Sequence, residues 1–206
     1  MYAGTLLDIA MTHSETLIEQ AQAGEEKAIS KLVSLWYKRI YNFSYKYFGD
    51  HDLAMEATQK TFISMYQNIQ SLRNTDTFRP WLYRIASNHC HSEKRTGFKT
   101  MTVSYSQNSE SDGSRAHDVR DLDSDIQKNI HRSDLSDMLN QCLHQIPVEQ
   151  REVLIMKEFE GLKFREIAEI LNISENTVKS RLYYGLSQMR KVLKERNISK
   201  ETTYYE

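Results

Sequence analysis

The sequence predicts an all-α protein made of two small helical domains that are joined by a flexible acidic linker. Only two prolines and seven glycines occur among 206 residues, although β proteins use both residue types heavily in their turns. Apolar residues recur at three- and four-residue steps in both halves of the chain, which is the spacing of amphipathic helices. The stretch between the halves is polar and acidic, so we expect it to form no core.

The first domain is expected over residues 14–97 and begins with two helical segments. The first segment, residues 14–49, is interrupted near Gly24, and Asp50 is positioned to cap the second. Both segments carry apolar side chains at helical spacing, so each should bury one face. These positions are Ile29, Leu32, Val33, Trp36, Ile40, Phe43 and Tyr47 in the first segment, and Ala54, Thr58, Phe62, Met65 and Ile69 in the second.

A third helix follows a polar turn at residues 71–76. Asp76 or Thr77 can cap this helix, and Pro80 falls in its first turn, where a missing N–H does little harm. Between residues 79 and 99 five basic residues oppose one Glu, which suits contact with a nucleic-acid backbone. The apolar positions are Phe78, Trp81, Leu82, Ile85 and Ala86, and the basic ones are Arg79, Arg84, Lys94, Arg95 and Lys99.

The linker is expected over residues 98–132. Between Gln107 and Asp125 six acidic residues oppose only Arg115 and Arg120, and large apolar side chains are scarce. Such a composition cannot bury much surface, which predicts a flexible acidic connection. The acidic residues are Glu110, Asp112, Asp118, Asp121, Asp123 and Asp125.

The second domain, residues 133–197, is predicted to contain a helix-turn-helix. One helix ends at Pro147, and a second carries Val153, Leu154 and Phe159 and stops near Gly161. A short helix from Phe164 to Leu171, a turn at 172–174 and a long helix from Glu175 to about Arg196 then follow. The inner face of the long helix is expected at Val178, Leu182, Leu186, Met189 and Leu193, and small Ala168 permits close approach of the two helices.

The start of the long helix has the chemistry of a DNA-reading surface. Asn176, Lys179, Ser180 and Tyr183 are expected on the face away from the core, with Arg181 to one side. Amide, ammonium and hydroxyl groups bond base edges or phosphates, and the helix N-terminus attracts phosphate. From residue 163 to 196 eight Lys or Arg oppose four Asp or Glu, a local excess of four positive charges. The alternative interpretation is a solvated amphipathic helix pair.

The segment Leu143–Leu193, which includes "EIAEILNISENTVKSRLYYGL", resembles region four of the extracytoplasmic-function (ECF) sigma factors of the sigma-70 family. In that family the domain binds the minus-thirty-five promoter element through the helix that matches "SENTVKSRLYYGL". Other helix-turn-helix regulators share part of this motif. The resemblance, together with the exposed face, implies minus-thirty-five contacts at Asn176, Thr177, Lys179, Ser180, Arg181 and Tyr183.

Two N-terminal stretches, "DLAMEATQKTFISMYQNI" and "FRPWLYRIASNHCHSEKR", resemble region two of the same family. The resemblance implies that the helix at 52–69 packs on the clamp helices of the largest subunit of RNA polymerase. Lys60 stands where the family very often has Glu. This reversal either alters the polymerase contact or leaves a surface lysine without consequence. The implied contacts with core polymerase are Asp52, Glu56, Gln59 and Lys60.

The same resemblance implies a site for one base flipped out of the minus-ten element. Such a base needs an apolar slot and a hydrogen-bonding group at its Watson–Crick edge, and stacking contributes roughly 1–3 kcal/mol per base. Residues 72–77 are expected to form the slot, and the Asn88 amide offers both a donor and an acceptor. Trp81 and Ile85 are expected in the core. The implied minus-ten contacts are Leu72, Arg73, Asn74, Tyr83, Arg84 and Asn88.

Metal and catalytic chemistry find little support in the sequence. Adjacent residues of the run His89-Cys90-His91 point about 100° apart on a helix, so a zinc site would need distant ligands such as Cys142, His131 or His144. Both cysteines are expected as reduced thiols. No P-loop, Gly-rich dinucleotide turn, GxSxG or HExxH motif occurs. We therefore expect no cofactor, no metal and no enzymatic activity.

The expected function is that of an ECF sigma factor in the cytoplasm. Its partners would be core RNA polymerase, promoter DNA and an anti-sigma factor, and the regulon one of stress or envelope genes. Apolar runs are far shorter than the roughly 20 residues of a membrane helix, and no secretory signal is recognisable. Two alternatives remain open: a helix-turn-helix regulator that acts without polymerase, and an inactive sigma-like partner of an anti-sigma factor.

Overall fold

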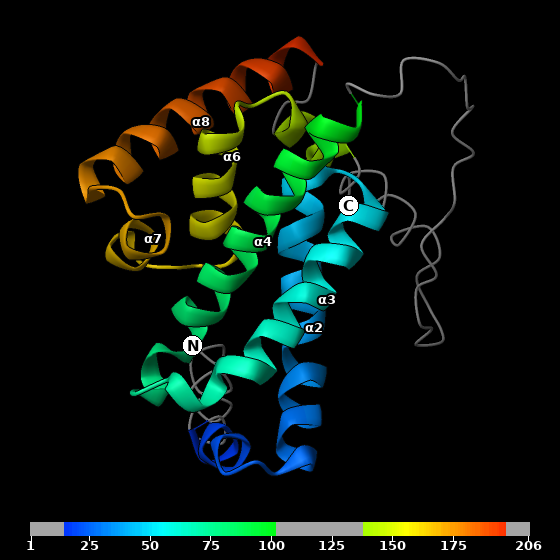
Figure 1. Cartoon of the computed structure of the whole chain (residues 1–206). Coiled ribbons are helices and arrows are strands. Elements are labelled where there is room, and N and C mark those ends of the chain that lie inside the picture. Colours follow the sequence, from blue (N-terminus) through cyan, green and yellow to red (C-terminus); the bar gives the residue numbers. More distant parts are fainter. Residues whose placement is uncertain (1–14, 102–137, 197–206) are drawn as a thin grey trace, which may run out of the picture.

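The computed structural model describes residues 15–101, with side chains as far as residue 94, and residues 138–196. Within these ranges every regular element is helical, as predicted (Figure 1). The N-terminal half consists of a helix over residues 15–22, α2 (Glu26–Phe48), α3 (His51–Asn68) and α4 (Phe78–Met101). The C-terminal half consists of a helix over residues 138–144, α6 (Val148–Leu154), α7 (Phe164–Leu171) and α8 (Glu175–Glu195).

The predicted linker lies mostly outside the described residues. Its first four residues, 98–101, continue α4 as helix, and residues 102–132 are outside the described ranges. The side chains of Arg95 and Lys99, which belong to the predicted basic strip, also fall outside them, as does His131. Among the helices that the structure describes, none is both long and apolar enough to cross a membrane.

The predicted breaks in the N-terminal half are largely confirmed. Gly24, with φ +89°, separates the 15–22 helix from α2, and Asp50 caps α3 by accepting a 2.8 Å hydrogen bond from the Leu53 N–H. The cap before α4 differs from the prediction. Asn74, not Asp76 or Thr77, accepts the N–H of Asp76, and it starts a short 3₁₀ turn, Thr75–Thr77, that runs directly into α4.

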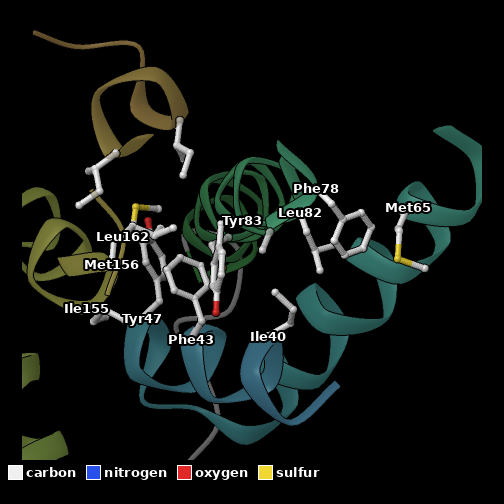
Figure 2. Packing of buried hydrophobic residues seen from close by; sticks show 14 of the residues in the cluster. Ile40, Phe43, Tyr47, Met65, Phe78, Leu82, Tyr83, Ile155, Met156 and Leu162 are labelled. Carbon is white, nitrogen blue, oxygen red and sulfur yellow. The ribbon is translucent and has the colours of Figure 1, made fainter. Parts of the chain in front are cut away.

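The two halves share one buried apolar cluster. Figure 2 shows Phe43 and Tyr47 of α2, Tyr83 of α4, and Met156 and Leu162 of the C-terminal half lying together. The predicted stripes of α2 and α3 contribute to this cluster, directly or through partly buried side chains. Since apolar burial is the main stabilising term in folding, the two halves stabilise one another in this arrangement.

A π-helical turn, Ile155–Phe159 (η3), connects α6 to the contact with the N-terminal half. The Glu160 N–H reaches back to the Ile155 carbonyl at 3.1 Å, five residues earlier, and Gly161 then ends the turn with φ +64°. Ile155 and Met156 are buried, whereas Phe159 is partly exposed beneath the Lys46 ammonium, 5.0 Å from its ring centroid. The wide turn thus presents both apolar and polar groups to α2 and α4.

His144 packs against the C-terminal end of α2. Gly49 ends α2 with φ +71°, and a Cβ at this position would lie 2.5 Å from His144 Nε2, so the close approach requires glycine. Arg151 donates a hydrogen bond to Nδ1 of the same ring. Burial, and secondly the charge of Arg151, lower the pKa of His144 to about 4.

Acidification between pH 6.5 and pH 4 is expected to destabilise the protein through His144. Its folded-state pKa of about 4 lies below its ordinary value of 6.5, so the unfolded chain takes up the proton first and stability falls as the pH drops through this window. The loss should be on the order of 1–2 kcal/mol, because partial exposure screens part of the effect.

Urea unfolding of the wild type and of His144→Gln across this pH range measures the loss. The difference between the two proteins cancels the contribution of His89, whose pKa is also lowered by burial and by Lys60. If the stability of both proteins falls equally with pH, the assignment to His144 is wrong.

Candidate nucleic-acid interface

The predicted helix-turn-helix is present as α7, a turn and α8. Asn172 ends α7 in the left-handed region at φ +53°, and Ser174 Oγ caps α8 by accepting the Thr177 N–H at 3.1 Å. Val178 and Leu182 are buried as predicted. These local contacts fix the angle at which the chain enters α8.

The inner face of α8 differs from the prediction in its second half. Leu186 is 40% exposed, whereas Gly185 is buried and a Cβ there would lie 3.4 Å from the Gln150 carbonyl of α6. The buried line therefore continues through Gly185 and Val192, with Met189 packed partly against the core. Position 186 is turned about 100° away from Gly185, so the approach of α6 to the glycine leaves Leu186 in solvent.

The outward face at the start of α8 carries the polar side chains that the sequence places there. Asn176, Lys179, Ser180 and Tyr183 are exposed, and Tyr183 is 68% exposed. Lys179 Nζ lies 5.7 Å from the ring centroid of Phe164 on α7, which holds the ammonium beside the turn. Thr177 and Arg181 flank this face and are partly buried. Figure 1 shows α8 on the outside of the molecule, with α6 between it and α4.

The turn that precedes α4 exposes most of the predicted slot. Arg73 and Asn74 are exposed, and Asn74 is held by its own cap to Asp76. Leu72 is buried, and its carbonyl accepts a 2.6 Å hydrogen bond from Gln22 Nε2. The structure therefore brings together a fixed backbone and two exposed polar side chains, while the Leu72 side chain contributes to the core.

The residues predicted on the promoter-facing side of α4 separate into two groups. Asn88 is exposed, as the prediction requires. Tyr83 is fully buried: its ring lies 5.5 Å from that of Phe43, and its hydroxyl donates to Glu160 of the C-terminal half. The expectation that Tyr83 reaches DNA is therefore not met in this arrangement. Arg84 is exposed, but its guanidinium donates to the Glu169 carbonyl of α7 at 2.9 Å.

Glu152 of α6 contacts α4 close to the proposed minus-ten residues, and the sequence analysis did not identify it. Its carboxylate accepts a 2.6 Å hydrogen bond from Ser87 Oγ and lies 2.9 Å from His91 Nε2, with the Glu152 side chain only 4% exposed. The sole sequence signal is an acid beside the apolar Val153 and Leu154. Because Ser87 and His91 lie on α4, this buried carboxylate joins the two halves.

The three side chains of the His89-Cys90-His91 run reach different partners, as their helical spacing predicts. His89 Nε2 lies 2.8 Å from Ser64 Oγ, while Cys90 is buried beside Ser44. Burial raises the pKa of the Cys90 thiol, which disfavours the thiolate form that would bind a metal. His91 pairs with Glu152.

The predicted polymerase face of α3 borders an apolar groove. Asp52, Glu56 and Gln59 are exposed, and the Lys60 side chain is 42% exposed. The groove, about 530 Å³ in volume, lies between α2 and α3. Its walls are Ile29, Val33, Tyr37, Met55, Gln59, Phe62, Ile63 and Tyr66.

Comparison with known proteins agrees with this geometry in both halves. The family described as Sigma-70 region 2 matches residues 32–97, and Sigma-70, region 4 matches residues 136–189. The chain is 30% identical over 190 residues to the ECF RNA polymerase sigma factor SigW of Bacillus subtilis, covering 86% of this chain and 95% of SigW. It is 26% identical over 190 residues to the RNA polymerase sigma-H factor of Pseudomonas aeruginosa, covering 90% and 96%.

Two solved structures share the fold. The sigma factor RpoE of Bartonella quintana, in complex with the anti-sigma factor NepR, matches with a TM-score of 0.64 and 21% identity over 82% of this chain and 98% of that one. CnrH, in complex with the cytosolic domain of CnrY, matches with a TM-score of 0.63 and 18% identity over 88% and 97%. The matches to both regions and to full-length relatives show that this chain belongs to the ECF group of RNA polymerase sigma factors in the sigma-70 family.

Proposed function

We propose that the C-terminal half reads the minus-thirty-five duplex with α8, while the N-terminal half binds core polymerase through α3 and the opened minus-ten strand through α4. The observation that carries this proposal is the exposed polar face of α8 on a helix-turn-helix. Asn176, Lys179 and Ser180 lie where a recognition helix presents its N-terminal residues to base edges, and Tyr183 and Arg181 suit contacts with the backbone.

The minus-ten site is proposed from the turn at 72–77 and Asn88. Arg73, Asn74 and Asn88 offer exposed polar groups near the start and along one face of α4. The Asn88 amide can pair with the Watson–Crick edge of an unstacked base. Arg84 supplies positive charge for the strand once it is released from the Glu169 carbonyl.

We infer that the two halves move apart when the chain binds both promoter elements. In the arrangement described above, which we call closed because the two halves pack against each other, the Arg84 guanidinium donates to α7. In the same arrangement Ser87 and His91 contact Glu152. Two modules on one chain gain affinity by effective concentration, provided that the connecting segment can span both sites. We therefore infer that the closed arrangement precedes promoter binding.

Control by an anti-sigma factor is the proposed mode of regulation. Two of the solved structures that share this fold are complexes of the sigma factor RpoE with the anti-sigma factor NepR and of CnrH with the cytosolic domain of CnrY. The apolar groove between α2 and α3 borders the face of α3 that is proposed to bind polymerase. The match of residues 32–97 to sigma region 2 disfavours the alternative of a helix-turn-helix regulator that acts without polymerase.

In-vitro transcription over a library of genomic fragments is expected to give promoter-specific starts only when core polymerase and this protein are combined.

Lys179→Ala should weaken protection of the minus-thirty-five region about tenfold, since one lost base or phosphate contact costs about 1–3 kcal/mol. Asn88→Ala should reduce initiation while binding of core polymerase is retained. The control is Lys191→Ala, which removes a 72%-exposed lysine three turns further along α8.

Two outcomes would contradict the proposal. Strong protection of duplex DNA by the protein alone, with no gain from core polymerase, would favour the regulator. Equal protection by the Lys179 variant and the wild type would exclude the proposed role of this face of α8.

A further inference from the structure

Lys60 lies in the seam between α3 and α4 and contacts both helices. Its Nζ is 2.8 Å from Glu56 Oε1, one turn earlier on α3, and 2.6 Å from Glu93 Oε1 on α4. The Glu93 side chain is only 8% exposed, whereas that of Glu56 is 50% exposed. A carboxylate removed from water to this degree requires a partner, because an unpaired buried charge is strongly destabilising.

A second polar pair crosses the same seam one turn away. Ser64 follows Lys60 by one turn on α3, and His89 precedes Glu93 by one turn on α4; Ser64 Oγ lies 2.8 Å from His89 Nε2. The two pairings run in opposite directions along the chain, as an antiparallel helix pair requires. Together they specify one register of α3 against α4, and Figure 1 shows the two helices side by side.

Small side chains leave this part of α3 dependent on polar contacts for its register. From Ala54 to Thr61 the buried residues are Ala or Thr, and the hydroxyls of Thr58 and Thr61 bond carbonyls of their own helix. Large interlocking side chains begin only at Phe62. Two helices that meet through small residues can slide along each other more readily than helices with interdigitated large side chains. The ion pair between Lys60 and Glu93 therefore contributes more to fixing the register of α3 against α4.

We propose that Lys60 is a positioning residue that holds α3 on α4 through Glu93, and not a direct contact with polymerase. This inference rests on the proposed function, in which α3 meets polymerase and α4 meets the promoter. Lys60 then fixes the spacing between those two surfaces. Hydrogen bonds to Glu56 and then Glu93 raise the pKa of Lys60, so the ammonium remains charged at neutral pH.

A charge-swap cycle with two readouts tests the proposal. Lys60→Glu places three carboxylates together, and it should raise the unfolding equilibrium constant and the Kd for core polymerase about tenfold each, equivalent to 1.4 kcal/mol. Glu93→Lys should have a similar effect through repulsion between two ammonium groups. The double variant Lys60→Glu/Glu93→Lys should return both quantities to within about threefold of the wild type.

Two control variants separate the pair from general charge effects. Lys60→Arg keeps the charge and should leave both quantities nearly unchanged. Lys38→Glu makes the same change in net charge at an exposed position of α2, and it should leave the unfolding constant near that of the wild type. Urea unfolding and titration of labelled protein with purified core polymerase supply the two measurements.

Each other result overturns the inference in an identifiable way. Recovery of stability in the double variant without recovery of polymerase affinity would make Lys60 a direct contact. No effect of Lys60→Glu on stability would make it an inert surface lysine, and single effects that merely add in the double variant would exclude the pair. A wild type that fails to bind core polymerase would refute the proposed function, while the stability cycle would still decide whether Lys60 and Glu93 are coupled.

Discussion

Tyr83→Ala is expected to lower the free energy of unfolding by about 3–5 kcal/mol, as for other large aromatic side chains truncated in a core. The Tyr83 ring is fully buried and lies edge-on to Trp36 and Phe43, with centroids 6.4 and 5.5 Å away. Its hydroxyl donates to Glu160, and burial together with Glu160 raises the pKa of Tyr83, so the hydroxyl remains protonated. Truncation therefore removes contacts within the N-terminal half and between the halves.

Tyr183→Ala is the matched control, because it makes the same truncation at a 68%-exposed position of α8. Its effect on stability should stay within about 0.5 kcal/mol, while binding to the minus-thirty-five duplex should weaken. Urea unfolding and a duplex-binding titration of both variants measure the contrast. If Tyr83→Ala proved as stable as the wild type and lost only minus-ten binding, Tyr83 would be a DNA contact and the closed packing would be wrong.

The pair Tyr83 and Tyr183 shows where prediction from the sequence succeeds and where it ends. Helical periodicity identifies which face of one helix is apolar, and the exposed start of α8 follows from Val178 and Leu182 alone. Tyr83 is different because it is covered from two directions, by α2 and by the turn after η3. Periodicity within α4 contains no information about a second partner that lies 77 residues away.

The same limit explains the exposure of Leu186 and the pairings of Lys60 and Glu152, whereas the cap before α4 was mispredicted although Asn74 and Asp76 are only two residues apart. The cap at Asp50 was predictable because it depends on Leu53, only three positions away. The exposure of Leu186 depends on the approach of α6 to Gly185, and the pairing of Lys60 depends on Glu93, 33 residues along the chain. The carboxylate of Glu152 meets Ser87 from 65 residues away. Contacts of this kind need the assembled fold.

Glu152→Ala is expected to destabilise the protein by about 1–3 kcal/mol and to loosen the two halves. The substitution leaves the buried Ser87 hydroxyl without this acceptor and removes one contact of His91, and an unsatisfied buried hydroxyl carries a cost of this size. Glu152→Gln retains an acceptor for Ser87 and should lose less. Glu158→Ala, at an exposed position of the η3 turn, is the control and should change stability by no more than about 0.5 kcal/mol.

Weakening the contact between the two halves should strengthen the binding of single-stranded minus-ten DNA. The contact at Glu152 lies one turn from Arg84, whose guanidinium is held by the Glu169 carbonyl in the closed arrangement. Glu152→Ala should therefore bind a minus-ten oligonucleotide more tightly than the wild type, and amide hydrogen exchange along α4 should become faster. Lower stability with unchanged oligonucleotide binding would mean that the halves separate without freeing the strand-binding face. Unchanged stability would mean that the buried carboxylate does not join them.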